Sequence, residues 1–151
     1  MITTITLEEL QNEANFVFRN GYTWGETVVY VLNKCYDLQL PDVSIALSSG
    51  FPYGFGVGGN ICGAVAGATM ILGSVFGRTQ RTDPLPQKCL DVTRELNDYI
   101  VVHRKTVICP EYIQDYTFAT PERKDHCTEL IFDILEIFAK IMERERGITI
   151  Q

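Results

Sequence analysis

The sequence lacks paired cysteines. Its five cysteines are single and widely spaced, at Cys35, Cys62, Cys89, Cys109 and Cys127. The absence of any Cys-x-x-Cys pair excludes the zinc-finger and ferredoxin patterns, and an odd, scattered set is not the disulfide framework of a small secreted domain. Any metal or redox site must therefore be assembled in space from separate segments of the chain.

The sequence also lacks an excess of basic residues and a leader-like N-terminus. Lys and Arg number 13 against 19 Asp and Glu, so the formal net charge is −6. This balance argues against a nucleic-acid partner, because neutralising phosphates requires clustered cations. Residues 1–9 contain neither a basic segment nor a continuous apolar run, so no signal peptide is expected. We expect a cytoplasmic protein with reduced thiols.

Charge is absent between Asp42 and Arg78, a stretch that holds nine of the twelve glycines. About 20 apolar residues suffice to cross a bilayer. Pro52, Asn60 and the glycines interrupt the first half, however, and leave only 61–76 as a continuous apolar helix of roughly 24 Å. We therefore expect a buried helix and no membrane span.

The segment from Gly54 to Gly59 matches the G-x-G-x-x-G fingerprint of dinucleotide-binding loops. Such a loop requires a preceding strand and a parallel sheet around it. The chain offers one short candidate strand, at 43–47, so a nucleotide site is not favoured. A glycine loop that leads into a helix can still bind an anion at the helix N-terminus.

Elsewhere the spacing of apolar residues predicts helices. The expected ranges are 7–19, 24–38, 60–77, 85–104 and 121–147, and residues 42–50 are expected to form a short helix or strand. The third helix carries Gly63, Ala64, Gly67 and Ala68 on one side, where another backbone can approach closely. The prediction is an all-α, single-domain bundle spanning 1–151, with about five helices around a Gly/Ala-rich central helix.

The cysteines and histidines differ in their predicted surroundings. Cys62 lies in the first turn of the third helix, where the helix dipole lowers the pKa of a thiol. Cys35 and Cys89 lie on apolar stripes and are expected to be packing residues. His126 is expected to be a solvated surface residue, and His103 to complement the carbonyl end of its helix.

The segment from Cys62 to Ala68, Cys-Gly-Ala-Val-Ala-Gly-Ala, resembles the core of a known signature. With Gly21-Tyr22 before it and the single Cys109 and Cys127 after it, nearly the whole chain resembles the C_GCAxxG_C_C family of small redox-associated proteins. The resemblance implies an all-helical fold whose cysteines converge on a redox or metal-cluster site, with no established substrate or reaction. Family members carry a cysteine where this chain has Trp24.

The resemblance implies that Cys62, Cys109 and Cys127 are redox thiols or metal ligands. An iron–sulfur cluster, a single metal ion or a disulfide pair would each be compatible with three thiols. Cys35 cannot replace the missing cysteine, because eleven residues of helix span about 16 Å. Residues expected to line the site are Trp24, Gly58, Gly59 and Gly63.

A second interpretation is a non-catalytic protein that binds a small ligand or a partner, with a degenerate cysteine site. Aromatic residues flank the charge-free stretch and are typical of an apolar ligand pocket. They are Tyr22, Trp24, Phe51, Tyr53 and Phe55. The sequence leaves open whether the protein is an enzyme, which redox partner or small ligand it binds, and whether it forms a homo-oligomer.

Overall fold

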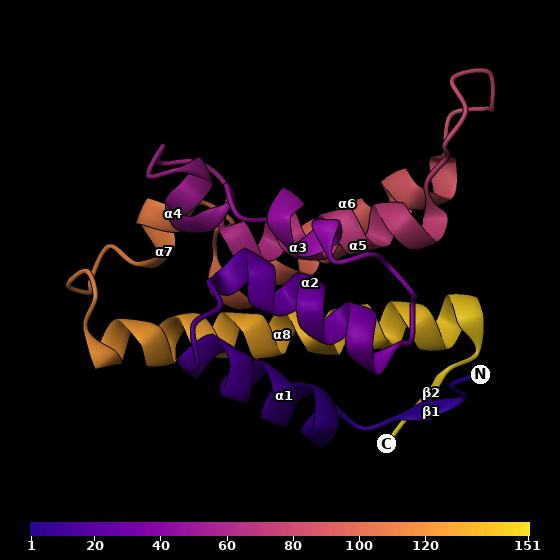
Figure 1. Cartoon of the computed structure of the whole chain (residues 1–151). Helices are drawn as coiled ribbons and strands as arrows, with labels where there is room; N and C mark the ends of the chain where they lie inside the picture. The colour runs from indigo at the N-terminus through magenta and orange to yellow at the C-terminus, as the bar shows by residue number, and fades with distance from the viewer.

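The computed structural model describes all 151 residues and is mostly helical (Figure 1). The five longer helices are α1 (Leu7–Arg19), α2 (Trp24–Cys35), α5 (Gly63–Phe76), α6 (Gln87–Arg104) and α8 (Pro121–Arg146). The short ones are α3 (Val43–Leu47), α4 (Pro52–Phe55) and α7 (Cys109–Tyr112). Strands β1 (Thr4–Ile5) and β2 (Thr149–Ile150) pair in parallel and bring the two termini together. The helical fold class is confirmed, whereas this small sheet was not predicted.

Polar residues fix the starts of several helices. The Thr6 hydroxyl accepts a hydrogen bond from the Glu9 amide, and the Glu9 carboxylate accepts one from the Thr6 amide, which forms a capping box before α1. The Thr120 hydroxyl accepts a hydrogen bond from the amide of Arg123, and Pro121 is the first residue of α8. The last and longest helix therefore begins where the sequence predicts.

Other boundaries differ from the prediction for local reasons. The second helix ends at Cys35, because Asp37 and Gln39 adopt positive φ angles of 51° and 59°. The third begins at Gly63 with Cys62 as its N-cap, since Ile61 forms an antiparallel bridge with Ile108. The candidate strand at 43–47 is the helix α3.

Glycines allow α2 and α5 to pack backbone to backbone. A Cβ atom added to Gly67 would lie 2.8 Å from the carbonyl oxygen of Gly25, and one added to Gly25 would lie 3.0 Å from that of Gly63. The face of small residues predicted on the third helix is therefore in close contact with another backbone. Helix α5 also contacts α6 and α8, and α8 contributes Leu130, Ile134 and Phe138 to the core.

The arrangement of the helices brings several of their N-termini together. Figure 1 shows α2, α5 and α8 starting at the same end of the bundle, beside the short α4 and α7. No helix of the structure combines the length and the apolar character needed to cross a bilayer.

Candidate functional site

Two cysteines are placed by the short pairing between the chain before α5 and the chain before α7. The amide of Cys62 donates to the Val107 carbonyl at 2.7 Å, and the amide of Cys109 donates to the Asn60 carbonyl at 2.9 Å. These bonds flank the antiparallel Ile61–Ile108 bridge. Cys62 and Cys109 are therefore diagonal neighbours across this bridge.

Cys127 joins this pair from the second turn of α8. Negative charge on Cys109 raises the pKa of Cys62, and charge on either Cys62 or Cys109 raises that of Cys127. All five cysteines are free thiols. We call Cys62, Cys109 and Cys127 the three-thiol site.

The other two cysteines lie elsewhere. Cys35 is the last residue of α2, where burial and the neighbouring Glu13 raise the pKa of its thiol. Cys89 lies in the first turn of α6, with its side chain partly buried. Neither residue contributes to the electrostatic surroundings of the three-thiol site.

Burial dominates the electrostatics of the three-thiol site. Cys62 is 8% exposed, and burial raises the pKa of its thiol to about 11, although the amides of Val65 and Ala64 at the start of α5 lower it. The prediction of a lowered pKa for Cys62 is therefore wrong, because desolvation of the thiolate outweighs the helix N-terminus. Burial also raises the pKa of Cys127 to about 12 and raises that of the partly buried Cys109.

A buried arginine lies beside the thiols. Arg123 is 2% exposed, forms no salt bridge, and has an Nε atom without a hydrogen-bond partner. Three aromatic rings surround its guanidinium carbon, with centroids at 4.8 Å for Trp24, 5.3 Å for Tyr53 and 4.6 Å for Phe118. We call these three rings the Arg123 cage.

The positive charge of Arg123 lowers the pKa of all three thiols, against the larger effect of burial. The sequence patterns above do not indicate Arg123 as a site residue. A signal was present, since Arg123 precedes Cys127 by four residues and residues so spaced share one face of a helix.

Trp24, where the resemblance implies that family members carry a cysteine, is part of this site. It is 8% exposed and packs edge-on against Tyr53 at 4.9 Å. Its indole N–H has no oxygen or nitrogen acceptor and lies beside the Cys127 thiol, whose pKa it lowers. The indole is therefore the ring of the Arg123 cage that borders the three-thiol site.

The glycines proposed to line the site have different environments. Gly58 and Gly59 are exposed. Gly63 is buried, and a Cβ atom there would lie 2.9 Å from the carbonyl oxygen of Phe51. Ligand binding by these residues stays a prediction.

The glycine-rich segment forms a left-handed turn. Tyr53, Gly54 and Phe55 have φ angles of 58°, 70° and 67°, and each non-glycine residue in this conformation costs about 1–2 kcal/mol. The turn places Tyr53 against Trp24 and Arg123. The element directly before it is the helix α3 and not a strand, so the fingerprint lacks the context of a nucleotide loop.

The arrangement fits a metal poorly. No group of three or more histidine, cysteine, aspartate or glutamate side chains is arranged to hold a metal ion. The guanidinium of Arg123 already supplies a positive charge beside the thiols, and a like charge disfavours a second cation. Metal or iron–sulfur binding by Cys62, Cys109 and Cys127 stays a prediction, and no step below depends on it.

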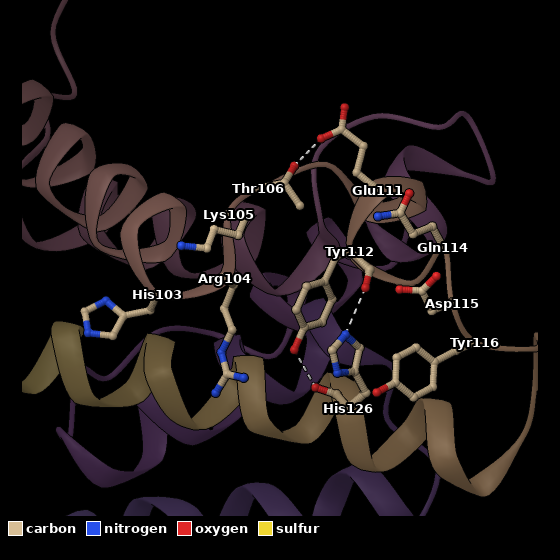
Figure 2. A pocket seen from close by; sticks show the side chains of 10 residues that line it. All are labelled: His103, Arg104, Lys105, Thr106, Glu111, Tyr112, Gln114, Asp115, Tyr116 and His126. Carbon is tan, nitrogen blue, oxygen red and sulfur yellow. Dashed lines mark hydrogen bonds between the residues drawn. The ribbon is translucent and has the colours of Figure 1, made fainter.

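Figure 2 shows how α7, which carries Cys109, is fastened to α8. The Tyr112 hydroxyl donates to the His126 carbonyl at 2.6 Å, and His126 Nε2 bonds to the Tyr112 carbonyl at 2.8 Å. A carbonyl only accepts, so Nε2 carries the proton. Tyr116 stacks on the His126 ring with centroids 4.2 Å apart. His126 is therefore a partly buried link between two helices, which corrects its prediction as a solvated residue.

Two cavities lie near this end of the bundle. An open cavity of about 590 Å³, drawn in Figure 2, has Arg104, Lys105 and the Tyr112–His126 pair in its walls. His103 at its rim bonds through Nδ1 to the Tyr99 carbonyl in the last turn of α6, as expected. A second, apolar cavity of about 430 Å³ is lined by Phe51, Phe55, Ile61, Val65, Ala66, Thr69, Met70, Thr93 and Asn97. Trp24 lines neither cavity.

Comparison with known proteins identifies one family. A family model described as putative redox-active protein (C_GCAxxG_C_C) matches residues 22–141, a range that contains every residue of the three-thiol site and the Arg123 cage. No curated protein matches the chain, and no solved structure matches it.

Proposed function

Because the chain belongs to the C_GCAxxG_C_C family of putative redox-active proteins, we propose that it exchanges thiols and disulfides through Cys62 and Cys109, with Cys127 as a third thiol. One observation carries the proposal: Cys62 and Cys109 are diagonal neighbours across the Ile61–Ile108 bridge. Cys109 is partly exposed and Cys62 is buried. Cys109 is therefore accessible to a partner disulfide, as expected of the attacking thiol, and Cys62 is shielded, as expected of the resolving thiol.

The exchange proceeds in two steps with a disulfide supplied by a partner protein or a small molecule. Cys109 loses its proton to solvent and attacks one partner sulfur, so the partner S–S bond breaks and one partner thiol leaves with a proton. Cys62 then loses its proton and attacks the Cys109 sulfur, which releases the second partner thiol. The net change oxidises two protein thiols to one disulfide and reduces the partner disulfide to two thiols.

The backbone geometry sets a requirement on this reaction. Diagonal neighbours in an antiparallel pair have Cα atoms about 7–8 Å apart, whereas a disulfide usually joins Cα atoms about 4.4–6.8 Å apart. Formation of the bond therefore requires α7 to move slightly toward the start of α5. Helix α7 has only four residues and is held on α8 by Tyr112 and His126, so a small shift of this segment suffices.

Oxidised glutathione is a suitable probe. The protein is incubated with it, alkylated, digested without reduction and mapped by mass spectrometry. We expect a cross-link between the peptides of Cys62 and Cys109. Cys62→Ser should instead leave glutathione attached to Cys109, because the resolving thiol is missing, and a Cys35→Ser/Cys89→Ser protein should behave like the wild type. Equal modification of all five cysteines without a cross-link would contradict the proposal.

The apolar cavity supports a second candidate function, binding of an apolar small molecule. Its wall includes Phe51, Phe55 and Val65, and such a wall is typical of ligand sites. Stoichiometric binding of an apolar fluorescent dye that is abolished by Ala66→Phe would support this function. Binding that is unchanged in Ala66→Phe would exclude this cavity as the site.

A further inference from the structure

Arg123 is the least expected residue of the site, because its charge is buried without a carboxylate. Its side chain is 2% exposed and forms no salt bridge, and its Nε atom is unpartnered. The Arg123 cage supplies the negative faces of three rings, which attract a cation. Rings carry no net charge, so they leave the guanidinium without a counter-ion.

The thiols are the groups beside Arg123 that can become negative. Cys127 lies on the same face of α8, four residues further on. Cys62 and Cys109 lie at the starts of α5 and α7, and the nearby Arg123 guanidinium lowers the pKa of both thiols. Cys109 is also the one thiol of the three that is not fully buried.

We propose that Arg123 is the charge-stabilising residue that makes Cys109 the attacking thiol. Its caged guanidinium offsets the negative charge that forms on the Cys109 sulfur when the proton leaves. This proposal rests on the thiol–disulfide function above and adds the residue that selects among its thiols. The left-handed turn at Tyr53 places one ring of the cage beside the guanidinium.

The titratable groups that face the Cys109 sulfur are few. They are Arg123 and Cys127 on α8 and Cys62 at the start of α5. On α7 itself, the Glu111 carboxylate accepts a hydrogen bond from the Thr106 hydroxyl. If substitution of Arg123 changes the pH dependence of Cys109 alkylation, the loss of the guanidinium charge is therefore the cause.

The test measures the alkylation rate of each cysteine by iodoacetamide across pH, with peptide mass spectrometry. Alkylation forms an S–C bond to the thiolate and releases iodide, so its rate follows the thiolate fraction. In Arg123→Met we expect Cys109 to react about tenfold more slowly at pH 7. The pH at which its alkylation rate is half-maximal, the Cys109 midpoint, should rise by about one unit. Arg123→Lys should remain within about threefold of the wild type. Cys89 is the internal reference, and Arg94→Met, which removes an exposed arginine of an i,i+4 pair, is the matched control.

A second variant keeps the test decisive if Arg123→Met does not fold. Phe118 is the outer ring of the cage and is 56% exposed, so Phe118→Ala should fold. It admits water to the guanidinium, so we expect a higher Cys109 midpoint. An unchanged Cys109 rate and midpoint in the folded variants would overturn the proposal, as would faster alkylation of Cys62 than of Cys109 in the wild type. Failure of the glutathione cross-link in the wild type would instead overturn the thiol–disulfide function.

Discussion

Tyr112 and His126 exchange two hydrogen bonds, each side chain with the backbone carbonyl of the other residue, and their rings stack with centroids 4.0 Å apart. Tyr112 follows Cys109 by three residues, and His126 directly precedes Cys127. This reciprocal link therefore sets the position of one site cysteine relative to another. It also makes α7, a single turn of helix, depend on α8 for its place.

We predict that Tyr112→Phe loosens α7. The substitution removes the bond to the His126 carbonyl, and the loss of one such hydrogen bond costs about 0.5–1.5 kcal/mol. Unfolding in urea should show the lower stability, and amide hydrogen exchange should be faster in α7 than in α5. Tyr116→Phe is the control, because Tyr116 stacks on the same ring and its hydroxyl bonds to no protein group. Equal effects of the two substitutions would contradict this role for the Tyr112 hydroxyl.

Two glycines of α5 should respond to alanine in opposite directions. Gly67→Ala places a Cβ atom 2.8 Å from the Gly25 carbonyl oxygen, and such overpacking typically costs about 1–3 kcal/mol. Gly73→Ala meets no atom within 4 Å, and the gain in helix propensity should stabilise the protein by about 0.5–1 kcal/mol. Urea denaturation of both variants checks the pair. Destabilisation of similar size in both would mean that the contact between α2 and α5 is not what requires Gly67.

The parts of the fold that the sequence predicted depend on local interactions. The five longer helices follow from apolar periodicity and from caps such as Thr6 and Thr120, which act within a few residues. The close contact of α5 with α2 was also predictable, because a face of small residues allows only a backbone to approach.

The parts that could not be predicted depend on contacts distant in sequence. The start of α5 shifts from Asn60 to Gly63 because Ile61 pairs with Ile108, 47 positions away. The raised pKa of Cys62 comes from burial by other segments, which overrides the local helix N-terminus. The Arg123 cage combines rings from α2, α4 and the chain before α8, and no spacing in the sequence indicates that set.

A cysteine at position 24, where the resemblance implies the family's first cysteine, should not create a metal site. Trp24→Cys removes a buried indole that packs on Phe18, Tyr53 and Arg123, and truncating a buried tryptophan costs about 3–5 kcal/mol. The Arg123 guanidinium would remain beside the four thiols and oppose a metal cation. We expect a lower melting temperature and no bound metal after anaerobic purification with iron or zinc. Trp24→Phe, which keeps an aromatic ring, should lose less stability. Stoichiometric metal in Trp24→Cys would show instead that the site is a degenerate cluster site.

Stability should fall at high pH because of the buried thiols. The pKa of Cys62 is raised by burial from 9.0 to about 11, so the folded state holds this proton more tightly than the unfolded state does. The stabilisation is complete below pH 9 and is lost as pH rises through the folded pKa near 11. A difference of about 2 units corresponds to roughly 2.7 kcal/mol. Cys62→Ala removes this titration. Between pH 8 and pH 11, the free energy of unfolding should therefore fall less in Cys62→Ala than in the wild type, by about this amount. Cys89→Ala serves as the control. Parallel pH profiles for the wild type and Cys62→Ala would mean that the Cys62 thiol titrates alike in both states, and would contradict its burial.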